Sequence, residues 1–441
     1  MIPSFYQTCT IQAFQMLKRL LKFLKSNYHK VVQSIAFYPV LINVLFLVGA
    51  IVAIQVEGFD IITKLKKEAP FLFIQDYDTA RSILSTFIGG MISLTVFSFT
   101  MVMVVLSQAS SDFSPRLLPG LVSNKKHQII LGFYIGTLLY CTIILIALGA
   151  NGLDSNKLGL STMLAAIFSV GCIGLFVYFI HSISRAIQIH NIIEGIFEES
   201  NKFLKDELKK QNSGEVALQY VDTEDWETLR VNKTGYFRGF DIDLMENSIK
   251  DLENQIEVLP YLNEHIWKGA PVLRIQGEVT DAQRENLIFC LNISSNRHEV
   301  NKGIGGLIKL MEIAVKAMSP GINDPGTAID AVTKSGQLLG QFLQLPKITS
   351  QVLEKEKLIL IQNNISAEEL MRIVIQPIRL YSKKDSAVMY ELIAALRFIE
   401  RGNNLSDVNK KVVAAELDAM YADIDTYIEN TADRARLVKL F

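Results

Sequence analysis

The chain has 441 residues, of which 49% are hydrophobic and only 20% are charged, and its formal net charge is −1. A balanced charge gives no support for nucleic-acid binding. The four cysteines form no CxxC pair, which argues against a disulfide framework or a structural zinc site. We therefore expect no nucleic-acid partner, no metal and no cofactor. The composition is typical of a charge-free membrane bundle joined to an ordinary water-facing domain.

Four long stretches free of Asp, Glu, Lys and Arg occupy the first 184 residues, and nothing comparable follows them. A helix needs about 20 apolar residues to cross the hydrocarbon core of a bilayer, and each stretch exceeds that length. The second stretch is longer than a crossing requires, so we expect it to tilt or to extend beyond the bilayer. Within a membrane domain of residues 37–185, the predicted spans are about 37–57, 82–107, 129–150 and 161–183.

Basic residues indicate the orientation of these spans. Residues 1–36 carry five Lys or Arg residues among leucines, which predicts a basic amphipathic segment on an anionic membrane surface. A solvated, positively charged tail is the alternative. Counting Lys and Arg beside the spans gives nine on the side of this segment and five on the other side, which favours cytoplasmic N- and C-termini.

The second span has a face of small and hydroxylated residues. Small residues let helices approach closely, and hydroxyls can bond to a neighbouring backbone, so one interpretation is a packing seam. In the other interpretation the face lines a water-filled path through a homo-oligomer, and rings of Phe97 and Val104 close that path by dewetting. Steps of three or four residues along the predicted helix give this face as Ser82, Thr86, Gly90, Ser93, Phe97, Thr100, Val104 and Ser107.

The segment before the second span carries Asp76, Asp78 and Arg81. Repeated around a ring of subunits, the two acidic residues would concentrate cations at an outer mouth. The alternative is an ordinary solvated loop in which Asp78 caps the helix.

The third and fourth spans each contain a pair of residues one turn apart. Gly132 and Gly136 form a small-xxx-small pair, which is typical of close helix packing. His181 and Arg185 lie at the inner end of the fourth span, where an intramembrane histidine indicates a proton-linked role or, because it is near the interface, a hydrated side chain.

The remaining chain reads as a water-facing α+β region. We expect a helical linker over residues 186–214, because its apolar residues recur at helical spacing. Strand candidates separated by turns predict a small β-rich module over residues 215–280. Apolar-periodic segments predict a mainly helical part over residues 281–441. The predicted fold is thus an α-helical membrane protein with four transmembrane helices plus a cytoplasmic α+β C-terminal domain.

The segment SPGINDP predicts a corner between two helices. We expect Gly321 to provide a left-handed exit from the first helix, with Asn323 or Asp324 capping the second and Pro325 at its first position. In the alternative, the polar side chains of this corner face a ligand or a subunit boundary. The residues of the cytoplasmic corner are Ser319, Asn323, Asp324, Pro325 and Thr327.

Four segments carry a family resemblance: SFTMVMVVLSQASSDFSPRLL, LGFYIGTLLY, GYFRGFDID and AVKAMSPGINDPGTAID. They resemble the bacterial predicted membrane proteins of the family named domain of unknown function 2254, in order, from roughly residue 35 to beyond residue 400. The resemblance implies an inner-membrane protein of four spans with a cytoplasmic C-terminal domain and no assigned function. Before the helix that leads into SPGINDP, the family has an arginine and then an acidic residue. This chain has the arginine, Arg297, and has Glu299 and Asn301 where the acidic residue is expected.

Three functions remain open from the sequence. The first is a homo-oligomeric pore for a small ion, lined by the second span and gated or assembled by the cytoplasmic domain. The second is a membrane-anchored sensor or scaffold that transports nothing, and the third, a secondary transporter, lacks support because no acidic residue lies deep in a span. Known catalytic motifs are missing from the sequence, so we expect no enzyme.

Overall fold

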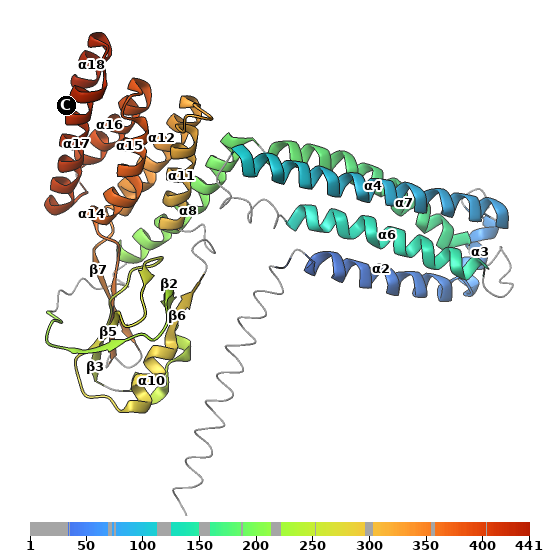
Figure 1. Ribbon diagram of the computed structural model, residues 1–441. Coiled ribbons are helices and arrows are strands. Elements are labelled where there is room, and N and C mark those ends of the chain that lie inside the picture. Colours follow the sequence, from blue (N-terminus) through green and yellow to red (C-terminus); the bar gives the residue numbers. More distant parts are fainter. Residues whose placement is uncertain are drawn as a thin grey trace, which may run out of the picture. The chain divides into compact units, whose positions relative to one another are not determined.

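The computed structural model divides into two compact units, one made mainly of residues up to Gln188 and one made mainly of residues from Ile189 onward (Figure 1). The predicted basic segment lies almost wholly outside the described residues, as do Arg297, Glu299 and Asn301. The structure describes residues 34, 36–68, 73–74, 76–112, 125–149, 159–186, 188–212, 222–251, 253–295, 303–353, 358–402 and 404–441.

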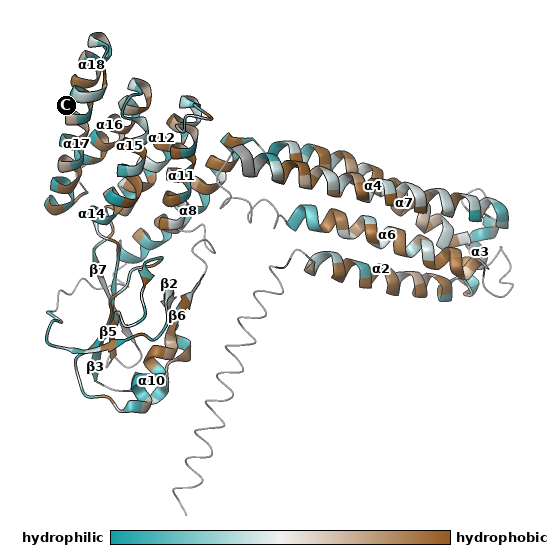
Figure 2. Ribbon diagram, viewed as in Figure 1, coloured by the Kyte–Doolittle hydropathy of each residue, from teal (hydrophilic) through white to brown (hydrophobic). Residues whose placement is uncertain are grey.

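The N-terminal unit is a bundle of long helices. Four of them are long and apolar enough to cross a membrane, which confirms the four predicted membrane helices, and Figure 2 colours many of their residues as hydrophobic. The second helix has 36 residues and begins before the predicted span. The helices of this unit are α2 (Phe37–Val56), the short α3 (Asp60–Glu68), α4 (Tyr77–Asp112), α6 (Lys125–Gly149) and α7 (Gly159–Ala186).

Helices α2 and α6 lie side by side (Figure 1), and two glycines of α6 mark where they approach most closely. A Cβ atom at Gly132 would lie 2.9 Å from the Cα atom of Pro39, and one at Gly136 would lie 2.6 Å from Cδ2 of Phe46. Real Cβ atoms do not approach other atoms so closely, so only glycine fits at both positions. The structure therefore confirms that this pair serves helix packing.

A buried carboxylate joins three helices at one end of the bundle. Glu57, which follows α2, accepts the backbone N–H of Ser161 in the first turn of α7 at 2.7 Å. The same side chain pairs with Lys66 of α3 at 2.5 Å, and both side chains are largely removed from solvent. The Tyr140 hydroxyl on α6 donates to the Ser161 carbonyl at 3.2 Å. The carboxylate thus accepts a hydrogen bond from a backbone N–H in the first turn of α7 and also neutralises the charge of Lys66.

The C-terminal unit begins with α8 (Ile189–Asn212) and contains two sheets. In the larger sheet β3 and β8 run parallel, while the other neighbours are antiparallel. Its strand order is β1 (Glu227–Arg230), β5 (Pro271–Ile275), β3 (Asn254–Val258), β8 (Leu358–Asn363) and β7 (Ile348–Leu353). The smaller, antiparallel sheet has the order β4 (His265–Ile266), β2 (Gly235–Phe240) and β6 (Leu291–Ser294).

Helices complete this unit. Helix α10 begins with a capping box in which Thr280 and Gln283 bond reciprocally. A five-residue π-helix, Met371–Ile375, precedes Pro377, which has no backbone N–H to continue the α-helical ladder. The helices are α9 (Asn247–Lys250), α10 (Asp281–Cys290), α11 (Ile304–Ala317), α12 (Pro325–Phe342), α14 (Ala367–Leu370), α15 (Gln376–Ser382), α16 (Ser386–Glu400), α17 (Asp407–Tyr427) and α18 (Thr431–Val438).

The larger sheet contains strands from two ranges that were predicted to be separate, the β-rich range 215–280 and the mainly helical range 281–441. Strands β7 and β8 come from the range predicted to be mainly helical, and β8 pairs with β3 of the β-rich range. Leu358 and Leu360 of β8 are fully buried in the same core as Ile256 and Val272. The two ranges therefore share one hydrophobic core.

Candidate functional site

Helix α4 packs on its own bundle along one narrow edge. Every seventh residue on this edge is buried: Leu84, Met91, Ser98 and Val105 are between 0 and 8% exposed. Leu84, Met91 and Val105 belong to hydrophobic clusters that also contain buried residues of α6 and α7. A seven-residue spacing keeps one edge of a helix against its neighbours, so the structure defines the packing seam of α4 clearly.

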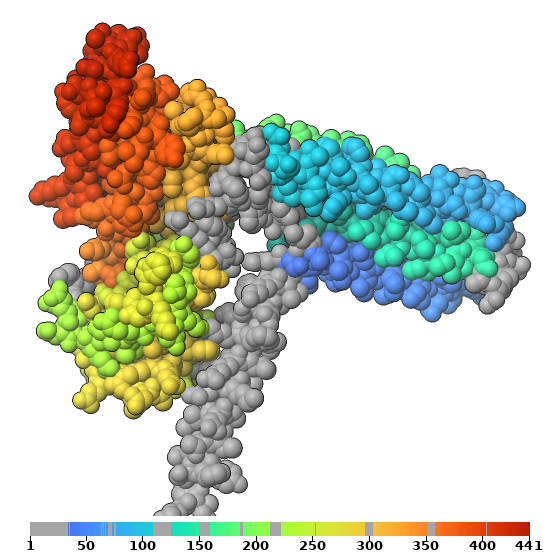
Figure 3. Space-filling model, in the orientation of Figure 1, coloured from blue at the N-terminus to red at the C-terminus, as the bar shows by residue number. Residues whose placement is uncertain are grey.

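The small and hydroxylated face predicted from the sequence lies on the opposite side of α4 from this seam. All of its residues are exposed within the protomer, among them Phe97 at 49% and Val104 at 57%. A Cβ atom at Gly90 would meet nothing within 4 Å. Phe97, at the border of this face, contacts the ring of Phe176 on α7. Figure 3 shows α4 on an outer side of its unit. The face is therefore turned toward lipid or toward another molecule, not into its own bundle.

The hydroxyl groups on this face bond to the preceding turn of α4. Such back-bonding uses the hydroxyl proton and leaves oxygen lone pairs directed outward. The face therefore presents acceptor oxygens, which can take hydrogen bonds from water or contact a cation. The three bonds are Thr86 to the Ser82 carbonyl at 2.8 Å, Ser93 to the Gly89 carbonyl at 3.0 Å and Thr100 to the Val96 carbonyl at 2.9 Å.

At the start of α4, the capping residue differs from the expected one. Asp76, not Asp78, caps the helix, since its carboxylate accepts the Thr79 backbone N–H at 2.8 Å and the Thr79 hydroxyl at 2.6 Å. These hydrogen bonds lower the pKa of Asp76. Asp78 lies in the first turn, and both it and Arg81 are exposed. The structure thus assigns Asp76 to the helix terminus and leaves Asp78 as the outward-facing acid.

At the other end of the bundle, His181 and Arg185 lie one turn apart on α7, and both are exposed. The buried histidine is instead His127 on α6, whose Nε2 atom lies 3.1 Å from the Ser182 hydroxyl and whose ring stands edge-on to Phe179. His127 precedes the predicted third span, and no local pattern in the sequence shows which helix covers it.

The SPGINDP corner forms between α11 and α12 as expected, with one correction. Asn323, not Gly321, adopts the left-handed conformation, with φ = 48°. Asp324 caps α12 by accepting the Thr327 N–H at 3.1 Å, and Pro325 is the first helical residue. Ser319 completes the turn, because its carbonyl accepts the Asn323 N–H at 3.0 Å. The hydrogen bonds of these residues stay within the corner, which favours the structural interpretation.

A cavity that the sequence did not predict lies in the C-terminal unit. It has a volume of about 560 Å³ and is lined by residues of α8, β2, β8 and the loops beside them. None of the predicted site residues lines it. Among the described residues, no group of three His, Cys, Asp or Glu side chains comes together as a metal site would require.

Comparison with known proteins agrees with this architecture. The family described as "Predicted membrane protein (DUF2254)" matches residues 32–397. An uncharacterized protein of Mycobacterium bovis is 26% identical over 267 residues, and so are uncharacterized proteins of two Mycobacterium tuberculosis strains. Each alignment covers 57% of this chain and 50% of the relative, so the chain spans about half the length of the curated relatives it matches. No solved structure matches the chain.

Proposed function

The chain belongs to this family of membrane proteins, and from that premise we propose that it forms a homo-oligomeric pore for a small ion, lined by α4. The observation that carries the proposal is the orientation of α4. Its apolar seam is occupied by its own bundle, whereas its hydroxylated face is exposed, with the contact of Phe97 with Phe176 of α7 at its border. Around a symmetry axis, that face would surround a common path.

The chemistry of the face suits a weakly selective or gated path. Acceptor oxygens of Thr86, Ser93 and Thr100 would replace part of the hydration of a permeating ion. Charged residues are missing from the sequence between Ser82 and Ser111, so no strong ion-binding site would hold the ion there. A ring of Val104 side chains would close the path by dewetting. Phe97 would form a second apolar ring once its side chain leaves its contact with Phe176 and turns into the path.

The proposal places the N- and C-termini in the cytoplasm of a bacterium, with the four helices in its inner membrane. Five basic residues on the outer side weigh against this orientation in a simple count of Lys and Arg. One of them, Lys66, is neutralised by the buried carboxylate of Glu57, which reduces that weight. The C-terminal unit would then assemble or gate the pore, through α8, which begins at Ile189 shortly after α7 ends at Ala186.

Accessibility of single cysteines tests the proposal. Ser93→Cys and Thr100→Cys, in a cysteine-free background in native membranes, should react with a water-soluble, membrane-impermeant thiol reagent. Ile92→Cys and Phe99→Cys are matched controls, because these side chains are equally exposed on α4 but lie on its apolar side, which we assign to lipid. Equal protection of all four cysteines would contradict a wet path and favour the rival function, a membrane-anchored sensor that transports nothing.

Conductance provides the second test. Purified protein in planar bilayers should show single-channel currents, and Phe97→Ser should increase the open probability because it removes an apolar barrier. Silence of both proteins across voltage, membrane tension and pH would refute the pore.

A proposal of catalysis has no support in the site, and we propose that the chain is not an enzyme.

A further inference from the structure

The cavity in the C-terminal unit is formed by pieces of chain that are far apart in sequence. Helix α8 provides one wall, strand β2 with the loop 259–264 provides a second, and the end of α12 with the β7–β8 hairpin provides a third. Gly303 and Ile304, at the start of α11, also line the space. A volume of about 560 Å³ falls within the range of small-molecule sites, about 300 to 1,000 Å³. All of these pieces belong to the same unit.

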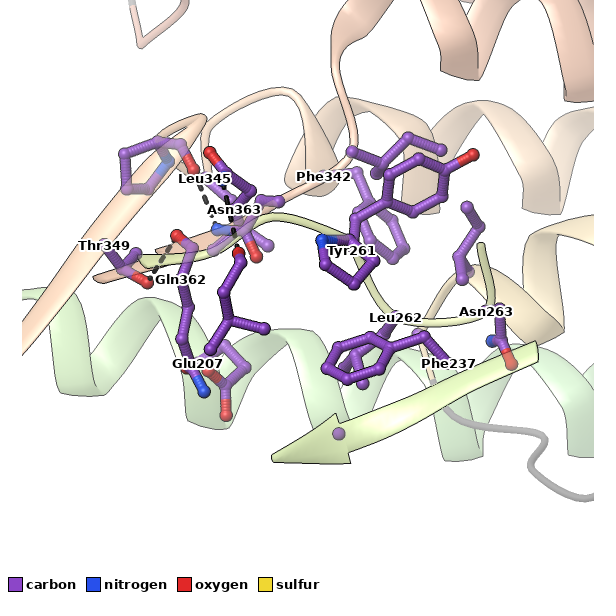
Figure 4. Close-up of a pocket in the computed structure, with 18 of the residues that line it drawn as sticks. Glu207, Phe237, Tyr261, Leu262, Asn263, Phe342, Leu345, Thr349, Gln362 and Asn363 are labelled. Carbon is purple, nitrogen blue, oxygen red and sulfur yellow. Dashed lines mark hydrogen bonds between the residues drawn. The ribbon is translucent and has the colours of Figure 1, made fainter. Parts of the chain in front are cut away.

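One half of the cavity is aromatic. Phe237, Tyr261 and Phe342 lie around the same space, with Leu262 beside them (Figure 4). The Tyr261 ring is held in place, because its hydroxyl donates to Glu369 at 3.1 Å and its backbone N–H donates to Glu264 at 3.1 Å. A fixed aromatic wall binds a flat ring without first losing side-chain entropy.

The other half of the cavity is rich in amides. Gln362 and Asn363 of β8 lie opposite the aromatic residues in Figure 4, and Gln211 and Asn364 also line the space. The Asn363 amide nitrogen donates to Glu257 at 2.7 Å, so its oxygen is left as an acceptor. The side chains of Gln362 and Gln211 make no hydrogen bond to other described residues. Gln362 and Gln211 can each offer a donor and an acceptor to a ligand, whereas Asn363, whose amide nitrogen also donates to the Val258 carbonyl at 3.2 Å, offers only its oxygen.

The charged side chains that line the cavity are Glu207, Lys210 and Arg238. Glu207 and Lys210 of α8 pair with each other at 2.8 Å, and Arg238 donates to the Asn263 side chain. The lining therefore carries two positive charges against one negative charge. It suits an uncharged ligand or one with a single negative charge, and it disfavours a polycation.

From this combination we propose that the cavity binds a nucleoside-sized ligand built on a planar nitrogen heterocycle. The ring would stack against the wall of Tyr261, Phe237 and Phe342, as bases stack on aromatic side chains. Its edge, with alternating donors and acceptors, would pair with Gln362 and Asn363. An acyl chain fits less well, because burying it there would leave the Gln362 amide and the Asn363 oxygen without partners.

Titration of the full-length protein in detergent tests the inference. Adenosine, guanosine, cytidine and uridine are titrated separately by isothermal calorimetry, and at least one should bind saturably. Gln362→Leu, which keeps the side-chain size and removes the amide, should weaken that binding about tenfold, the usual effect of one lost hydrogen bond in a buried site. Gln276→Leu is the matched control, since Gln276 is exposed on the same unit away from the cavity.

Three outcomes would overturn the inference. The first is no heat and no thermal stabilisation with any of the four nucleosides at millimolar concentration. The second is binding that Gln362→Leu leaves unchanged, and the third is saturable binding of dodecanoate in place of the nucleosides, which would make the cavity a lipid site. None of these measurements depends on conduction, so they leave the proposed pore unaffected.

Discussion

Gly136 on α6 faces Phe46 on α2 so closely that a methyl group at position 136 would lie 2.6 Å from the ring carbon Cδ2. We therefore expect Gly136→Ala to destabilise the protein by about 1 to 3 kcal/mol, the usual cost of overpacking a tight contact. The midpoint of thermal unfolding in detergent measures the effect.

Gly174→Ala on α7 is the control for this substitution, because a Cβ atom there would meet nothing within 4 Å. Alanine favours helix over glycine, so this variant should be as stable as the wild type or slightly more stable. Equal loss of stability in both variants would show that the close approach of α2 and α6 does not decide the effect.

The ion pair between Glu57 and Lys66 provides a second prediction. Lys66→Met leaves a buried carboxylate without its cation and should cost about 3 kcal/mol of unfolding free energy. Glu57→Gln keeps an acceptor for the Ser161 N–H, so the double variant should lose much less than the sum of the two single losses. Lys64→Met, at an exposed position of α3, is the control. Strictly additive losses would contradict a coupled pair.

The membrane part of this fold could be predicted from sequence because it depends on a local property. A run free of charge and longer than a bilayer crossing identifies each span without knowledge of its neighbours. The positions of the ends were less accurate. Helix α4 begins at Tyr77 because Asp76 bonds to Thr79, and the sequence offered Asp78 as an equally reasonable cap.

The C-terminal unit was harder to predict because its organisation depends on pairing between distant segments. The parallel pairing of β3 with β8 has no local signature, because neither short strand indicates in its own residues which distant strand it pairs with. The cavity was missed for the same reason. Phe203, Tyr261 and Gln362 are unremarkable in sequence, and only the tertiary fold brings them to one space.

The corner between α11 and α12 allows a direct test of the corrected assignment. Asn323 has φ = 48°, a conformation that costs alanine about 1 to 2 kcal/mol and costs glycine almost nothing. Asn323→Ala should therefore lower the unfolding free energy by about 1 kcal/mol, while Asn323→Gly should not. Gly321→Ala should be tolerated, because a Cβ atom there meets nothing within 4 Å. Greater damage from Gly321→Ala than from Asn323→Ala would restore the original expectation.

Asp324 makes the stability of the same corner depend on pH. Its hydrogen bonds to the Thr327 hydroxyl and backbone lower the pKa of Asp324 below the ordinary value of 3.8. A lowered folded-state pKa means that the cap contributes stability above about pH 4 and loses it as the pH falls below 3.8 through the folded-state value. Asp324→Ala should therefore cost about 1 kcal/mol at neutral pH, and this difference from the wild type should shrink toward pH 3.

Asp324→Asn separates the hydrogen bonds from the charge. Asparagine is an equally good N-cap, so this variant should keep most of the stability at neutral pH, and its cap should not titrate between pH 3 and 5. Unfolding by denaturant at neutral pH and near pH 3 measures both effects, because the midpoint shifts in proportion to the lost free energy. A difference between wild type and Asp324→Ala that stays constant across this range would show that the ionised carboxylate does not stabilise α12.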